Sequence, residues 1–186
     1  AFDVVFSEPQ DDVDDLSMEA ALKSSQLVYL PMLYDLLPGK VKYFYRSEGV
    51  TNAYEPIKRF SRFVRGSGHI NAVPDMDGIL RRAPAVISYN GKVTSHFGIK
   101  IGADILGVKD QDIIFYPDSH SLLLKLPDGG SRMIPLDKDN QLIVNWVGPW
   151  GSDFKHYSYI DIIKSYARMK EGKKPIIDLN ILKGKI

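Results

Sequence analysis

Apolar residues recur every three or four positions in several stretches of the chain, and this spacing predicts amphipathic helices. We expect helices over residues 13–22, 55–65, 95–106 and 158–169. The last has the clearest pattern, with Ser158 as its N-cap and Asp161 completing an acidic variant of the capping box. The sequence therefore predicts helices distributed along the whole chain.

Short runs rich in β-branched and aromatic residues predict strands between these helices. We expect such strands over residues 2–7, 41–46, 83–89, 92–94, 113–116, 122–126, 142–147 and 176–182. Asn90-Gly91 lies between two of these runs and predicts a hairpin, because both central residues of a type I′ turn need positive φ. Residues 26–34 fit either a strand or a helix, and Pro31 argues against a central strand.

The order of these elements predicts the fold class. Helices alternate with strands, and the runs at 113–116, 122–126 and 142–147 are separated by turn residues, which indicates an antiparallel patch. We therefore expect an α/β or α+β fold in one domain over residues 1–186, with a mixed β-sheet flanked by helices and a hairpin-rich antiparallel section. Because both ends of the sequence run into apolar patterns, we expect a fragment truncated at both ends.

Composition and charge exclude several classes of function. The chain has 24 basic and 23 acidic residues, so its net charge of +1 gives no field suited to a nucleic acid, and we expect no nucleic-acid partner. It has no cysteine, which removes disulfides, thiolate zinc sites and cysteine nucleophiles. Nor does the sequence contain a run of about 20 apolar residues, the length that spans a bilayer.

The densest group of polar and turn residues lies between Gly66 and Arg82. Within it, His69, Asp75 and Asp77 could form a metal site or a general acid/base pair, since imidazole and carboxylate groups suit both tasks. The structural alternative is a turn at Pro74–Gly78, in which aspartates accept backbone N–H groups and Gly78 takes positive φ. In that case Arg81 and Arg82 face opposite sides of the next strand, and one of them returns to an aspartate of the turn.

Motifs of the common enzyme classes are missing from the sequence. It lacks a phosphate loop, a His-Glu-x-x-His zinc motif and a Gly-x-Ser-x-Gly elbow. The remaining histidines, His96, His120 and His156, have no partner at metal-ligand spacing. We therefore expect no catalytic activity, no metal and no cofactor in this chain.

The central block resembles a known family. The runs 68–71 and 74–78 followed by Arg81-Arg82, with 2–9 upstream, are similar to the CHASE domain of the second type, an extracellular sensory module of bacterial cyclases, histidine kinases and related receptors. The runs 134–137, 145–148 and 157–163 follow the order of segments in that family. The resemblance covers most of the chain, although the family's first strand and helix and its closing segment are missing here.

This resemblance implies a sensory domain outside the bacterial inner membrane or cell membrane. Its parent would be membrane-anchored, with a cytoplasmic output domain in the same chain, an unknown small-molecule ligand and a possible homodimer. The family establishes no ligand or catalytic residue, so the resemblance implies only structural roles for Asn71, Asp75, Asp77, Gly78 and Arg81. Two alternatives remain: a hydrolase using His69, Asp75 and Asp77, or a protein-binding module.

Overall fold

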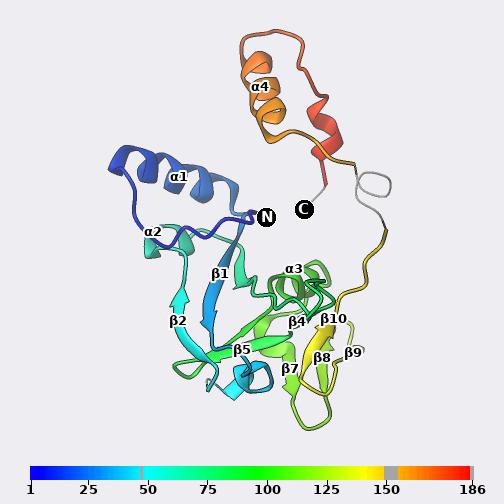
Figure 1. Cartoon of the computed structure of the whole chain (residues 1–186). Helices are drawn as coiled ribbons and strands as arrows, with labels where there is room; N and C mark the ends of the chain where they lie inside the picture. Colours follow the sequence, from blue (N-terminus) through cyan, green and yellow to red (C-terminus); the bar gives the residue numbers. More distant parts are fainter. Residues whose placement is uncertain (47, 149–154, 185–186) are drawn as a thin grey trace. The chain divides into compact units, whose positions relative to one another are not determined.

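The computed structural model describes residues 1–46, 48–148 and 155–184, which divide into two units, 1–144 and 145–186. Across the described residues, four α-helices and ten strands in several small sheets form an α+β fold, as expected (Figure 1). The single sensory domain over residues 1–186 stays a prediction.

One sheet of the first unit is mixed and has three strands in the order β2-β1-β3. β1 (Tyr29–Leu36) pairs antiparallel with β2 (Val50–Tyr54) and parallel with β3 (Gly66–His69). Pro31 therefore lies in a central strand, contrary to expectation. Its missing N–H interrupts no strand pairing. On the β3 side, the Ile70 N–H donates to Met32 O, and on the other side β2 pairs with β1 only from Leu33 onward.

Two predictions for the N-terminal half were wrong because tertiary contacts take up the residues concerned. Residues 2–7 form no strand; Phe2 N donates to Tyr29 O at 3.2 Å, and Phe6 O accepts from Ile57 N at 2.8 Å. The helix expected over 55–65 is limited to α2 (Lys58–Ser61). It ends there because Arg65 N already bonds Val28 O at 2.7 Å, at the edge of β1.

The first predicted helix is confirmed as α1 (Asp12–Ser25), whose N-cap Asp11 accepts the Val13 N–H. By contrast, residues 41–46, expected as a strand, form the 3-10 helix η1 (Val41–Arg46). Phe44 of this turn is 1% exposed and packs with Met32, Tyr34, Val50 and Ile87. The buried ring of Phe44 thus anchors this segment in the core.

The Asn90-Gly91 hairpin is confirmed, with φ angles of 49° and 77° at the two turn residues. It joins β5 (Val86–Tyr89) to β6 (Lys92–Ser95), and α3 (Phe97–Ile105) follows as predicted. The run 83–89, expected as one strand, is split at Ala85. Its first part, β4 (Arg82–Pro84), pairs with β10 (Gln141–Ile143) instead of with β6.

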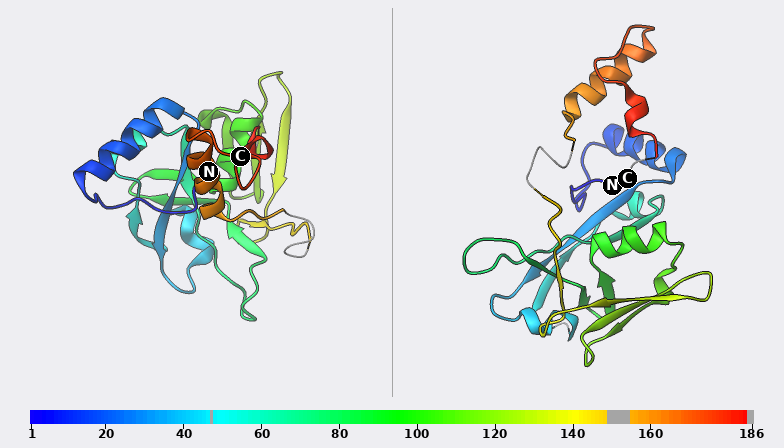
Figure 2. Two further views of the ribbon diagram at one scale, coloured as in Figure 1. Left: turned by 90° about the horizontal axis from the view of Figure 1, so that it is seen from above. Right: turned by 90° about the vertical axis from the view of Figure 1, so that its right-hand side faces the viewer.

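The antiparallel patch is confirmed in its first two strands and corrected in its third. β8 (Ser121–Lys125) lies between β7 (Ile113–Tyr116) and β9 (Ser131–Pro135), whereas the run expected as the third strand, 142–147, contributes to β10. A 3-10 turn, η2 (Asp110–Asp112), leads into β7. Figure 2 shows α3 lying over this sheet, where Ile99 and Ala103 share a buried core with Leu122 and Leu124.

The second unit contains α4 (Tyr159–Lys170) and the 3-10 helix η3 (Leu179–Leu182). Helix α4 is confirmed with Ser158 at its N-cap, but the expected capping box does not form, since the Ser158 side chain makes no capping bond within the described residues. The strand expected over 176–182 was also wrong. Ser165 Oγ accepts the Ile177 N–H at 2.8 Å and holds the segment against the helix instead of against a sheet.

Candidate functional site

The central block forms the turn that its sequence predicts. Asp75 N donates to Ile79 O at 3.0 Å, and Gly78 N donates to Asp75 O at 2.8 Å. Gly78 has a φ of 78°, which an L side chain rarely adopts. Asp77 Oδ1 accepts the Ile79 N–H at 3.1 Å. The aspartates and the glycine therefore act together as turn residues.

Two arginines brace this turn. Arg81 bonds both Asp77 carboxylate oxygens, at 2.9 and 2.8 Å, and also reaches Asp75 at 3.0 Å. Arg82 pairs with Asp75 and lies 3.5 Å from Asp137 Oδ2. Both arginines thus return to Asp75, which corrects the expectation that they face opposite sides; Arg81 precedes β4, so the strand period does not apply to it.

The arginines also set the charge of the two carboxylates. The Arg81 guanidinium lowers the pKa of Asp77 to about 2. Hydrogen bonds from Arg82, and then from Arg81, lower the pKa of Asp75. Both groups are therefore ionised at neutral pH and already paired, an arrangement poorly suited to a general base.

His69 and Asn71 lie in the core and not with the aspartates. Asn71 accepts the Tyr34 N–H at 3.0 Å and donates to Tyr34 O at 2.7 Å, as a further strand residue would. His69 is fully buried, and neither ring nitrogen has a hydrogen-bond partner among the described residues. Its ring neighbours are Tyr34 and His96, at centroid distances of 6.3 and 5.2 Å. The structure therefore does not join His69 to Asp75 or Asp77 by any hydrogen bond.

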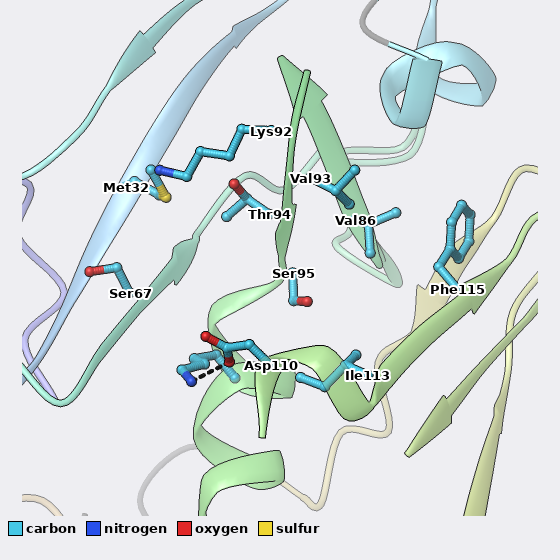
Figure 3. Close-up of a pocket in the computed structure, with 11 residues that line it drawn as sticks. Met32, Ser67, Val86, Lys92, Val93, Thr94, Ser95, Asp110, Ile113 and Phe115 are labelled. Carbon is cyan, nitrogen blue, oxygen red and sulfur yellow. Dashed lines mark hydrogen bonds and ion pairs between the residues drawn. The ribbon is translucent and has the colours of Figure 1, made fainter. Parts of the chain in front are cut away.

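A pocket of about 390 Å³ lies elsewhere in the first unit, bordered by β1, β3, β5, β6, α3, η2 and β7 (Figure 3). One part of its wall is apolar and comprises Met32, Val86, Val93, Ile113 and Phe115. The other part is polar and comprises Ser67, Lys92, Thr94, Ser95, Lys100 and Asp110. The lining is therefore mixed, with apolar surface that a small molecule could contact and polar groups that could orient it.

The polar groups of the pocket differ in how firmly they are held. Lys100 forms an ion pair with Asp110, and Thr94 Oγ1 lies 2.7 Å from the Tyr34 hydroxyl. Lys92 pairs with Glu55 at 2.8 Å, with both side chains about half exposed. Figure 3 shows Lys92 and Asp110 at opposite ends of the lining, with Thr94 and Ser95 between them. The pocket therefore has one enclosed cation and one at its rim.

Comparison with protein families decides the class of the chain. A model of the CHASE2 domain matches residues 1–186. The chain belongs to the CHASE2 family. CHASE2 domains are sensory, non-catalytic and extracellular, and they occur in receptors such as cyclases and kinases. Searches of curated proteins and of solved structures found no significant match.

The recognition made from the central block is thus confirmed. Within the part of this CHASE2 domain that the structure describes, no group of three or more acidic or histidine side chains is placed to hold a metal ion. None of the helices in that part has the length and apolar content needed to cross a bilayer.

Sequence reasoning missed the pocket of this CHASE2 domain, because its residues come from elements far apart in the chain. Ser67 lies on β3, which the sequence did not predict, and Asp110 lies in a 3-10 turn. One local signal was present: Gly66 and Gly68 flank Ser67. A Cβ at Gly66 would lie 2.5 Å from Lys100 Cε, so this glycine makes room for the lysine.

We expect Asp77→Ala to lower the melting temperature of the CHASE2 domain by about 2–4 °C, because it removes the bidentate Arg81 contact and a turn hydrogen bond. Asp128→Ala is the matched control, since Asp128 Oδ1 accepts the Gly130 N–H in another turn. Thermal unfolding should show a smaller shift for Asp128→Ala. Equal shifts would mean that the arginine contributes nothing.

Proposed function

We propose that this chain is the extracytoplasmic signal-input domain of a bacterial transmembrane receptor whose cytoplasmic output domain is an adenylate or guanylate cyclase, a histidine kinase or a related enzyme. The observation that carries this proposal is the CHASE2 match over all 186 residues. The parent would lie in the bacterial inner membrane or cell membrane. The chain itself binds the signal and leaves catalysis to the output domain.

The proposed signal is a small molecule. A pocket of about 390 Å³ with mixed apolar and polar walls supports a ligand of this size class. Such a ligand changes output only if it binds one state of the receptor more tightly than another. In the proposed homodimer, that differential affinity would alter the contacts between the two copies and hence the geometry passed through the membrane.

An exchange of domains in the full-length receptor tests this function. Replacing residues 1–186 with an unrelated soluble domain is expected to leave expression and membrane insertion intact and to make output insensitive to the natural stimulus. The measurement is output activity across a range of stimulus concentrations. An unchanged dose dependence in the chimera would assign sensing to another part of the receptor.

A further inference from the structure

The lining of the pocket includes Lys100, whose side chain is mostly buried. The Lys100 side chain is 13% exposed, whereas its partner Asp110 is 76% exposed. Most of the Lys100 side chain is therefore shielded from water, whereas the Asp110 carboxylate is well solvated.

The Lys100 side chain lies beside Gly66 of β3. Gly66 on β3 lacks the Cβ that would lie 2.5 Å from Lys100 Cε, so the stem of the lysine crosses the strand there. Lys100 N bonds His96 O at 3.0 Å in the first turn of α3. The helix thus fixes the Lys100 backbone, and the stem of the side chain lies over Gly66.

Asp110, in contrast, can be replaced as the counter-ion. An exposed carboxylate gains little from an ion pair, since water solvates it nearly as well. A carboxylate that enters from the pocket would take its place beside Lys100 with no loss of charge balance. Lys92 is already paired with Glu55, which lies outside the lining, so Lys100 is the lining cation that an incoming anion would use.

The remaining wall defines the rest of the ligand. Val86, Ile113 and Phe115 present apolar surface to the same space, and burying an apolar group against them is favourable. Ser67 and Ser95 add hydroxyl groups that can donate or accept a hydrogen bond. A pocket of about 390 Å³ lies near the lower end of the range for small-molecule sites.

We propose that this pocket binds a small organic carboxylate with a short apolar group, and that the ligand carboxylate displaces Asp110 from Lys100. The claim that this ligand is the receptor's signal rests on the proposed sensory function. The claim that the pocket binds such a ligand rests on the geometry of the pocket alone.

The test uses three acids as probes: 3-methylbutanoate, 2-hydroxy-3-methylbutanoate and phenylacetate. Binding to the chain is measured by ligand-observed NMR and titration, beside the neutral amide of each acid. At least one acid is expected to bind, with its amide at least about tenfold weaker, because the amide cannot form the charge-assisted bond to Lys100. Failure of all three acids to bind, or equal binding of acids and amides, overturns the proposed ligand class.

Variants of the ion pair test the anchor. Lys100→Gln should weaken acid binding by at least about tenfold, whereas Asp110→Asn should strengthen it by removing the competing carboxylate. Lys138→Gln is the matched control, since it removes the same charge from an exposed turn. Because the two pocket variants move affinity in opposite directions, a general loss of folding cannot imitate the result. If Lys100→Gln and Asp110→Asn both leave the affinity for the acid unchanged, the role of Lys100 as the anchor is overturned.

The same variants separate this inference from the sensory function. Acid binding through Lys100, combined with a full-length Lys100→Gln receptor that responds normally to its stimulus, would keep the binding site and overturn its role in sensing. Absence of acid binding, combined with loss of response after domain exchange, would overturn the ligand class and keep the sensory function.

Discussion

Replacing Gly68 by alanine is expected to destabilise the domain by about 1–3 kcal/mol, the usual cost of overpacking a filled core. A Cβ at Gly68 would lie 2.8 Å from Phe97 Cα and 2.9 Å from Ser95 O. Both neighbours are backbone atoms, which cannot move aside as a side-chain end can. Gly68 is therefore the point at which β3 approaches the start of α3, and chemical denaturation measures the cost of filling it.

Gly102→Ala provides the matched control for Gly68→Ala. Gly102 lies within α3, and apart from the neighbouring helix backbone no atom lies within 4 Å of the place where its Cβ would be. Because alanine is the better helix former, this change should stabilise the domain by up to about 1 kcal/mol. If Gly68→Ala were tolerated as well as Gly102→Ala, β3 and α3 would not be packed as closely as described.

Acidification is expected to destabilise the domain through His69. Burial, and to a lesser degree the neighbouring His96, hold the pKa of His69 well below its ordinary value. Below about pH 6.5 the unfolded chain therefore takes up a proton that the folded chain does not, and stability falls by up to about 1.4 kcal/mol per pH unit. His69→Phe keeps an aromatic ring in place and removes this proton uptake, so its stability should depend less on pH in this range.

Urea unfolding of both proteins between about pH 6.5 and pH 5 measures this difference. Burial also lowers the pKa of His96, so His69→Phe should retain part of the slope. The braced turn responds at lower pH than the histidines. Because the pKa of Asp77 is lowered to about 2, the stabilising effect of Asp77 is lost only as the pH falls below the ordinary aspartate range. Identical slopes for the two proteins would show that His69 is not the group responsible.

Sequence predicted the elements whose signals are local. The hairpin followed from Asn90-Gly91 alone, because two residues of a type I′ turn define the pairing of its flanks. Helices α1, α3 and α4 followed from apolar spacing. The braced turn is equally local, since Asp75, Asp77 and Arg81 lie within seven positions of one another.

Tertiary contacts determined the elements that the sequence did not predict. β3 consists of Gly66, Ser67, Gly68 and His69, of which the glycines disfavour a strand, and pairing with β1 holds them extended. The short apolar runs at 2–7, 41–46 and 176–182 had strand composition, yet packing placed them in a non-strand segment or in 3-10 helices. The pocket could not be predicted from the sequence either, because Ser67, Lys100 and Asp110 come together only after these elements have packed.

The most direct measurement of the central claim compares the receptor's stimulus with the stability of this chain. A molecule that signals by binding residues 1–186 must stabilise the state it binds, so the melting temperature of the chain should rise with stimulus concentration. The concentration dependence of that rise should follow the dose dependence of output in the full-length receptor. A stimulus that drives output through the full dose range and leaves the chain's melting temperature unchanged would contradict the role of this domain as the signal input.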